Sequence, residues 1–148
     1  MTRRACFIFD IDGTLADGAH RLHHIKKRPK DWEAYFAACG EDGPIGHVIA
    51  VALALNSAGH FIVLVSGRSK VVEGETRAWL RRHFPFYSAL YMREIGDHQD
   101  DDKLKIELLA QMREDGWEPV MAFDDRTRIV RAWRAAGVPC AQVAEGDF

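Results

Sequence analysis

In Phe7-Ile8-Phe9-Asp10-Ile11-Asp12-Gly13-Thr14-Leu15, an apolar run ends abruptly at two carboxylates that are one residue apart. The run predicts a buried strand, and the polar residues after it predict a functional site at the strand's carboxyl end. If the chain stays extended, Asp10 and Asp12 point to the same side; alternatively, the site uses Asp12 just past the strand, where the backbone turns at Gly13. Taken alone, Asp-x-Asp-Gly is also typical of an ordinary loop.

The closeness of these two carboxylates indicates a metal ion. Two such groups repel each other unless a cation lies nearby or one of them carries a proton. A hard divalent cation such as Mg²⁺ prefers oxygen ligands and fits the pair. We therefore expect a metal site at Asp10 and Asp12.

The bulk properties favour one domain that spans residues 1–148. The net charge of −2 gives no global positive field, so nucleic-acid binding would depend on local patches. Cys6, Cys39 and Cys140 form no CxxC pair, which argues against a zinc ribbon or a disulfide scaffold. Without a signal peptide or an apolar run that could span a bilayer, we expect a cytoplasmic protein with no membrane partner.

Strand-like and helix-like segments alternate along most of the chain. This order predicts an α/β fold in which helices cover both faces of a central parallel sheet of five strands. The predicted strands are residues 5–9, 61–65, 90–92, 120–123 and 140–143. The predicted helices are residues 45–58, 71–83, 102–114 and 126–136. The first of these helices is apolar nearly all round, so we expect it to be well buried.

Residues 16–44 interrupt the alternation and predict a small cap inserted after the first strand. A basic run precedes aromatic residues: Lys26, Lys27, Arg28, Lys30, Trp32, Tyr35 and Phe36. We expect a short helix at residues 31–39, preceded by a loop or frayed turn. Basic and aromatic residues together suit phosphates and stacked bases; the alternative is a solvated loop with an aromatic anchor. A metal site at His20, His23 and His24 lacks a fourth ligand with fitting spacing.

Three further motifs accompany the other predicted strands. Ser66-Gly67-Arg68 follows the second strand, Asp124-Asp125-Arg126 follows the fourth, and Lys105 lies on the helix before the fourth. Each alone is weak, because such residues commonly form turns, helix caps and solvated surfaces. Ligands of an open parallel sheet bind at the carboxyl ends of its strands, so we expect these motifs to converge on one edge.

As a set, these motifs resemble the four-motif signature of the haloacid dehalogenase (HAD) superfamily of phosphatases: Asp10-x-Asp12-Gly13-Thr14, Ser66, Lys105 and Asp124-Asp125. The later part of the chain is similar to the 3′-phosphatase domain of bacteriophage-type polynucleotide kinase/phosphatases. This similarity rests on Val63-x-Val65-Ser66-Gly67-Arg68, Thr76-Arg77-x-Trp79-Leu80, Asp124-Asp125-Arg126-Thr127, Trp133-Arg134 and the ending from Gly137 to Phe148. The resemblance implies a HAD-like Rossmannoid three-layer sandwich with a small helical cap. It also implies an enzyme that removes a phosphate from the 3′ end of DNA or RNA.

The resemblance implies a role for each acidic residue. Asp10 would be the nucleophile that forms an aspartyl-phosphate, and Asp12 would be the general acid and then the general base. Asp12 must then hold a proton when substrate is bound, which we expect beside a charged Asp10 and a phosphate dianion. Mg²⁺ would be held by Asp10, the backbone carbonyl of Asp12 and Asp124. Asp125 would bind it through water or orient the other ligands.

The resemblance also implies the groups that hold the substrate. Ser66 and Lys105 would hold the non-bridging phosphoryl oxygens. Arg68 and Arg126 would clamp substrate phosphates or brace the acidic cluster, and Arg21 matches a basic residue of the family's cap. The expected substrate contacts are completed by Gly67 and Thr14.

Three functions remain open at this point. The first is a 3′-end phosphatase, the second a small-molecule phosphatase acting on nucleoside monophosphates, and the third a non-catalytic nucleic-acid end-binding module. The short cap and the limited room for a second lid at residues 93–101 favour an open site that admits polymer ends, whereas the acidic run at residues 97–102 disfavours a polynucleotide.

The chain lacks a Gly-x-x-x-x-Gly-Lys-Ser/Thr loop, so we expect no 5′-kinase activity from it, and a kinase or ligase partner would be a separate protein. The preference for DNA or RNA, the use of cyclic phosphates and the oligomeric state are not determined by the sequence.

Overall fold

The computed structural model describes residues 2–148 and has the expected parallel five-stranded sheet at its centre. The strands lie in the order β5-β4-β1-β6-β7. Their bounds are β1 (Arg4–Phe9), β4 (Phe61–Ser69), β5 (Ala89–Arg93), β6 (Trp117–Asp124) and β7 (Cys140–Gln142). Because all neighbours are parallel, the carboxyl ends of all strands lie at one edge, which is where the predicted motifs meet.

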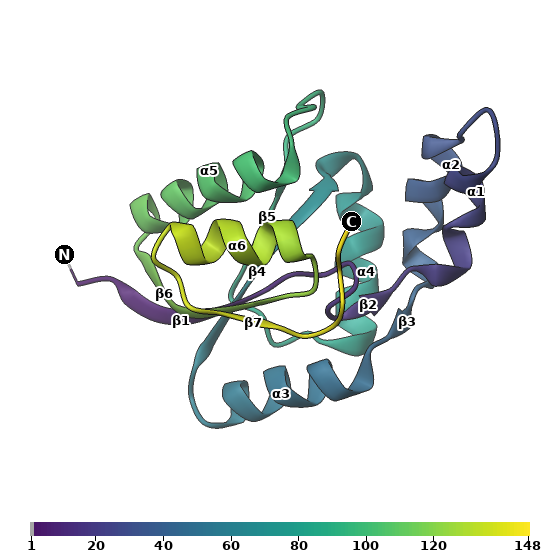
Figure 1. Ribbon diagram of the computed structural model, residues 1–148. Helices are drawn as coiled ribbons and strands as arrows, with labels where there is room; N and C mark the ends of the chain where they lie inside the picture. Colours follow the sequence, from purple (N-terminus) through teal and green to yellow (C-terminus); the bar gives the residue numbers. More distant parts are fainter. Residues whose placement is uncertain (1) are drawn as a thin grey trace.

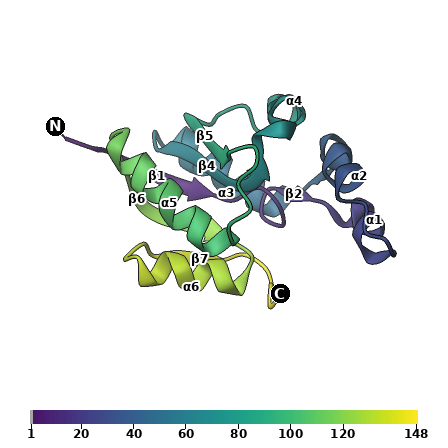
Figure 2. The ribbon, with the colours of Figure 1, turned by 90° about the horizontal axis from the view of Figure 1, so that it is seen from above.

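Helices cover both faces of the sheet, as the sequence predicts for a three-layer sandwich (Figures 1 and 2). One face packs against α3 (Gly46–Ser57) and α4 (Glu73–His83), which follows the short 3₁₀ turn η3 (Lys70–Val72). The other face packs against α5 (Asp101–Glu114) and α6 (Thr127–Ala135). Strand alternation separates the two cores: Ile8 belongs to the α5–α6 side, and Phe9 to the α3–α4 side. Within residues 2–148, every helix is too short or too polar to cross a bilayer.

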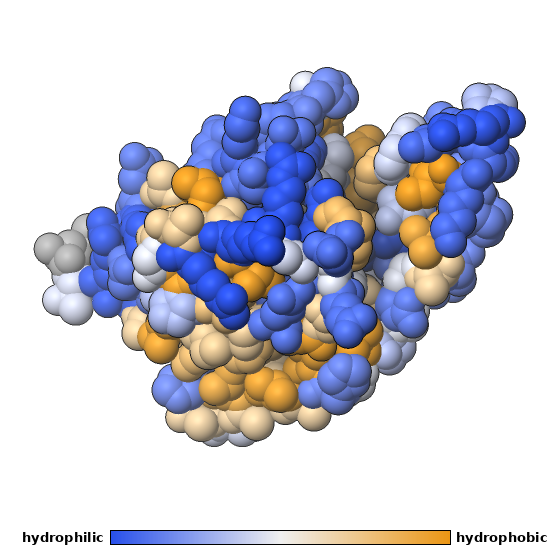
Figure 3. Space-filling model, viewed as in Figure 1, coloured by the Kyte–Doolittle hydropathy of each residue, from blue (hydrophilic) through white to orange (hydrophobic). Residues whose placement is uncertain are grey.

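Helix α3 is less buried than its composition predicts. Val48, Ile49 and Ala52 are buried, but Val51 is 43% exposed and Leu53 is 36% exposed. A sheet can cover only one side of a helix, so an apolar composition does not by itself imply burial all round. Figures 1 and 3 show the resulting apolar surface on the lower side of the molecule, where α3 lies.

The cap between β1 and α3 stands beside the carboxyl edge of the sheet (Figure 1). Its two ends are joined by an antiparallel pair, β2 (Ala16–Asp17) and β3 (Gly43–Pro44). Between them lie η1 (Ala19–Arg21), α1 (His23–Lys26), α2 (Trp32–Ala37) and η2 (Ala38–Glu41). The predicted helix at residues 31–39 is therefore divided into α2 and η2, and part of the basic run is helical instead of a loop.

Candidate active site

Three acidic side chains meet at the carboxyl edge of the sheet. Asp10 directly follows β1, whereas Asp124 ends β6 and Asp125 follows it. These strands are paired, and the backbone N–H of Asp10 donates to the carbonyl oxygen of Phe123 at 3.0 Å. One carboxylate oxygen of each aspartate lies within 4.8 Å of the others, and all three residues are buried. The structure thus brings these predicted metal ligands together.

The electrostatics of this acidic cluster favour a bound cation. Burial, and next the charge of Asp124, raises the pKa of Asp10 well above its usual value. The same two causes raise the pKa of Asp125. A divalent ion would offset both effects, and carboxylate oxygens are the ligands that Mg²⁺ prefers. Among residues 2–148 this is the single group of side chains placed to hold a metal ion, and its chemistry fits the predicted Mg²⁺.

The ammonium group of Lys105 lies between two of these carboxylates. Lys105 is buried near the start of α5, and its Nζ donates to Asp10 Oδ1 at 2.9 Å and to Asp124 Oδ2 at 2.7 Å. Burial alone would lower the pKa of Lys105, but the two carboxylates outweigh it and hold the pKa above its usual value. One positive charge among three carboxylates leaves negative charge for a metal ion to balance.

Two arginines hold the carboxylate of Asp12, which lies outside the acidic cluster. Arg68 Nε is 3.2 Å from Asp12 Oδ1 and 3.1 Å from Oδ2, and Arg68 Nη2 is 2.8 Å from Oδ1. Arg21 Nη2 donates to the same Oδ1 at 2.7 Å. Burial raises the pKa of Asp12, but the guanidinium groups outweigh it and the pKa is lowered. These contacts therefore do not favour the proton that the resemblance implies on Asp12.

Arg21 and Arg68 are buried and shared with a second carboxylate, that of Asp42. Asp42 follows η2 and accepts hydrogen bonds from both arginines. The sequence gives no signal for it, because an aspartate between Glu41 and Gly43 is typical of a turn. Of the two roles expected for Arg68, its contacts support bracing acidic groups, but these are Asp12 and Asp42 and not the metal-binding cluster.

The other predicted phosphate-binding residues lie at the same edge. Thr14 Oγ1 donates to Asp10 Oδ2 at 3.2 Å. Ser66 is buried, and its Oγ accepts the backbone N–H of Arg68 at 3.1 Å, which leaves the hydroxyl proton to donate elsewhere. The carbonyl oxygen of Gly67 accepts from Arg93 Nε at 3.0 Å.

The side chain of Arg126 does not contact the acidic cluster, although the backbone N–H of this residue donates to Asp124 Oδ1 at 3.3 Å. Its Nη1 pairs with Asp101 at 3.0 Å, and its Nε donates to the carbonyl oxygen of Phe148 at 2.6 Å. Arg93 pairs with Asp101 as well. The side chain of Arg126 therefore joins the C-terminal tail (residues 143–148) to the start of α5, and only the backbone of Arg126 braces a metal-binding carboxylate.

Arginines balance much of the acidic run at residues 97–102. Arg128 pairs with Asp100 at 3.2 Å and with Asp102 at 3.0 Å, in addition to the pairs of Asp101. The run is therefore less repulsive to a polyanion than the sequence indicates.

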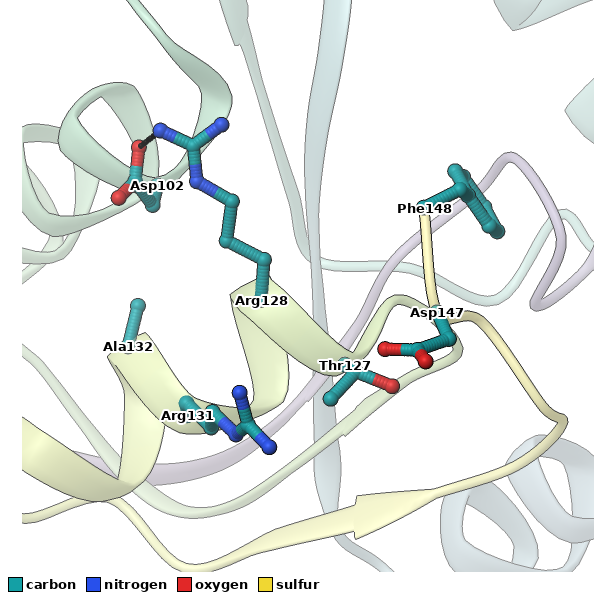
Figure 4. Close-up of a pocket in the computed structure, with 7 residues that line it drawn as sticks. All are labelled: Asp102, Thr127, Arg128, Arg131, Ala132, Asp147 and Phe148. Carbon is teal, nitrogen blue, oxygen red and sulfur yellow. Dashed lines mark ion pairs between the residues drawn. The ribbon is translucent and has the colours of Figure 1, made fainter.

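Two surface hollows lie near this edge. The first, of about 420 Å³, opens between the start of α5, the start of α6 and the tail (Figure 4). Arg128 reaches across it to Asp102, and Arg131 and Asp147 also line it, so its charges nearly cancel. The second, of about 380 Å³, begins at Gly13 and runs over β3, the start of α3 and residues 143–144. Neither hollow has the excess positive charge that a phosphate requires.

The cap presents basic and aromatic side chains to solvent. Lys26, Lys27 and Arg28 are exposed, and none of them forms an ion pair with another residue in the range 2–148. Trp32 is 48% exposed and stacks on Phe36, with 5.9 Å between ring centroids. This surface is suited to a polyanion.

The cap histidines do not form a metal site. His20 Nε2 lies 2.7 Å from Asp42 Oδ1, and His23 Nδ1 lies 3.0 Å from the carbonyl oxygen of His20. The rings of His23 and His24 are tilted against each other, with centroids 4.0 Å apart, and within residues 2–148 the cap histidines belong to no group of three side chains that could share a metal ion.

Sequence comparisons agree with this geometry. The model of the family described as "Polynucleotide kinase PNKP phosphatase domain" matches residues 4–148. A protein of Autographa californica nuclear polyhedrosis virus, described as a candidate bifunctional polynucleotide kinase/RNA ligase, is 29% identical over 131 residues. That match covers 88% of this chain and 18% of the viral protein.

Solved structures share the fold. A chain of a Pnkp1/Rnl/Hen1 complex matches with a TM-score of 0.82 and 27% identity, over 100% of this chain and 48% of that chain. A class C acid phosphatase from Bacillus anthracis matches with a TM-score of 0.63 and 15% identity, over 97% of this chain and 70% of that chain. The chain thus spans less than half of the viral relative and of the complex subunit.

Proposed function

Because the chain belongs to the family of the polynucleotide kinase PNKP phosphatase domain, we propose that it is a Mg²⁺-dependent phosphatase that removes the 3′-phosphate from DNA or RNA ends. Its family and fold place it among the HAD-superfamily phosphatases. The observation that carries the proposal is the meeting of Asp10, Asp124 and Asp125 with Lys105 at one edge of the sheet.

In the proposed reaction, a carboxylate oxygen of Asp10 attacks phosphorus and the bond from phosphorus to the 3′ oxygen breaks. Asp12 gives its proton to the departing oxygen, so the leaving group is an alcohol and not an alkoxide. A water molecule then attacks the phosphorus of the aspartyl-phosphate and transfers a proton to Asp12. The bond from phosphorus to the Asp10 oxygen breaks, which releases inorganic phosphate and restores the Asp10 carboxylate. The approach of the phosphate dianion would raise the pKa of Asp12, opposing Arg21 and Arg68.

The metal ligands would be the Asp10 and Asp124 carboxylates and the backbone carbonyl of Asp12, with Asp125 acting directly or through water. Mg²⁺, when bound, supplies positive charge that offsets the charge on the phosphoryl oxygens. Lys105, the Ser66 hydroxyl, Thr14 and the backbone at Gly67 would hold those oxygens. These groups are buried or fixed by hydrogen bonds, so they need little reorganisation when substrate arrives.

Two observations support a polymer substrate over a metabolite. The exposed Lys26, Lys27 and Arg28 of the cap carry positive charge and form no ion pair within 4 Å of an acidic residue in the range 2–148. Arginines also balance the acidic run at residues 97–102. We propose that the cap surface binds the phosphate backbone next to the terminal phosphate, and that separate kinase and ligase proteins or domains act on the same ends.

The deciding experiment compares kcat/KM for three matched substrates in Mg²⁺: an oligonucleotide with a 3′-phosphate, the same oligonucleotide with a 5′-phosphate, and a nucleoside 3′-monophosphate. DNA and RNA versions are tested in parallel. We expect the 3′-phosphorylated oligonucleotide to be preferred. A preference of orders of magnitude for the mononucleotide would instead identify a small-molecule phosphatase, and tight end binding without turnover would identify a binding module.

A further inference from the structure

We propose that Asp42 is a positioning residue for the reaction, acting through Arg21 and Arg68 to fix the carboxylate of Asp12. The inference rests on the proposed function, in which Asp12 protonates the leaving oxygen. Asp42 itself does not face the acidic cluster, and no motif in the sequence points to it. The contacts of its buried side chain carry the inference.

Four hydrogen bonds fix the carboxylate of Asp42. Its Oδ1 accepts from Arg21 Nε at 2.8 Å and lies 2.7 Å from His20 Nε2. Its Oδ2 accepts from Arg21 Nη2 at 2.9 Å and from Arg68 Nη2 at 3.1 Å. The side chain is completely buried, so these four contacts replace the water that a carboxylate otherwise binds.

The same guanidinium nitrogens reach Asp12. Arg21 Nη2 is 2.7 Å from Asp12 Oδ1, and Arg68 Nη2 is 2.8 Å from it. Each nitrogen therefore bridges the two carboxylates. Two arginines and two aspartates balance in charge, but the two carboxylates differ in exposure: the Asp42 side chain is 0% exposed, and the Asp12 side chain is 41% exposed. Asp42 is thus the fixed end of the network, and Asp12 is the end that a substrate can reach.

The backbone around Asp42 is anchored on two sides. Trp79 Nε1, on α4, donates to the carbonyl oxygen of Asp42 at 2.6 Å. The next residues, Gly43 and Pro44, pair with Asp17 and Ala16 in the β2–β3 ribbon. The backbone of Asp42 is therefore held by both the sandwich and the cap, and its carboxylate in turn holds both arginines in place. Without its charge, Asp12 alone would face two buried guanidinium groups, which would draw its carboxylate away from the leaving oxygen.

Asp42→Asn tests this role, because asparagine keeps the shape and one oxygen but removes the charge. Turnover is measured on a 3′-phosphorylated oligonucleotide, whose leaving oxygen needs a proton, and on p-nitrophenyl phosphate, whose leaving group needs none. Because Asp12 is also the base that activates water in the second step, which both substrates share, the two substrates are compared by kcat/KM, which reports formation of the aspartyl-phosphate. In that step a positioning residue for a general acid should matter only for the oligonucleotide. We expect kcat/KM on the oligonucleotide to fall about 10- to 100-fold, and kcat/KM on p-nitrophenyl phosphate to fall less than about 3-fold.

Two further variants separate positioning from folding. Val130→Ala opens a cavity in the α5–α6 core, away from this network, and should lower turnover on both substrates by the same factor. If Asp42→Asn does not fold, His20→Ala weakens the network from its exposed side, and the oligonucleotide should lose about 2- to 5-fold more turnover than p-nitrophenyl phosphate. Equal losses on both substrates, or no loss, would overturn the role of Asp42. A wild-type protein that hydrolyses neither substrate would instead overturn the proposed function.

Discussion

The carbonyl oxygen of Asp125 lies only 2.1 Å from the point that a Cβ atom on Gly146 would occupy. Gly146 is buried, and its own carbonyl accepts the backbone N–H of Thr127 at 2.8 Å. The tail therefore packs directly on the backbone that presents the metal-binding carboxylates. Only a residue without a side chain permits this approach, so the tail contributes to the position of Asp125.

Gly146→Ala should damage both stability and activity. The added methyl group must displace the backbone of Asp125 or the tail, which we expect to cost about 1–3 kcal/mol of unfolding free energy and to weaken Mg²⁺ affinity. Urea unfolding and Mg²⁺ titration of turnover measure the two effects. Gly74→Ala is the matched control, because Gly74 lies in α4 and a Cβ atom there would meet no neighbouring group within 4 Å; at this position we expect a gain of about 0.5–1 kcal/mol. Equal changes in unfolding free energy and in Mg²⁺ affinity for the two variants would contradict the proposed packing constraint.

Asp10→Asn should abolish turnover without unfolding the protein. The amide cannot act as the nucleophile, so we expect a loss on the order of 10³-fold or more. Removing one charge also relieves repulsion with Asp124, and Lys105 keeps Asp124 as a partner, so the thermal midpoint should not fall. Glu114→Gln, at the exposed far end of α5, is the control for loss of one carboxylate. Retained phosphatase activity in Asp10→Asn would show that Asp10 is not the nucleophile.

Removal of divalent metal should abolish activity, and Mg²⁺ should stabilise the fold. A ligand present at 100 times its Kd stabilises the native state by about 2.7 kcal/mol. Asp124→Asn removes one expected ligand, so the thermal midpoint of this variant should respond much less to Mg²⁺ than that of the wild type. A midpoint shift of the same size in both proteins would place the ion elsewhere.

The five strands of the central sheet and their places along the chain were predictable because each is an apolar run, but the ends of the strands and their spatial order were not. β4 continues through Ser69, where it pairs with Arg93, although Ser66-Gly67-Arg68 is typical of a turn. β6 begins at Trp117, three residues before the predicted start at residue 120, because the register shift between Cys6 and Phe7 accommodates Pro119 within the strand.

The acidic cluster was predictable because its residues follow strands, and the parallel sheet alone brings them together. The network around Asp42 was not, because it depends on how the cap folds back on β4. The resemblance implies that Arg68 clamps substrate phosphates or braces the acidic cluster and that Arg21 matches a basic residue of the family's cap, whereas the folded cap supplies a buried carboxylate for both. In the same way, the exposure of Val51 on α3 depends on which neighbours the sheet provides, and composition does not report it.

The cysteines should be unreactive in the native state. Burial raises the pKa of Cys6 and of Cys140 to about 12, and burial also raises the pKa of Cys39. At pH 8, a thiol with a pKa of about 12 is ionised to about one part in 10⁴, so reaction with a thiol reagent should require unfolding. Because the folded-state pKa is raised, this contribution to stability is complete below about pH 9 and is lost as the pH rises towards 12. Three thiols reacting rapidly without denaturant would contradict the burial.

Removing the cap charges should weaken oligonucleotide binding in a salt-dependent way. Lys27→Ala combined with Arg28→Ala deletes two exposed charges that form no ion pair within 4 Å of an acidic residue in the range 2–148. If both contact a single strand, the slope of log K against log salt should decrease in magnitude by about 1.4. Arg3→Ala combined with Arg113→Ala is the control: it also removes two positive charges, but both pair with Glu118 on β6, so the slope should stay nearly constant. An unaltered slope in the cap variant would show that the basic run is a solvated surface and that nucleic acid binds elsewhere on the protein.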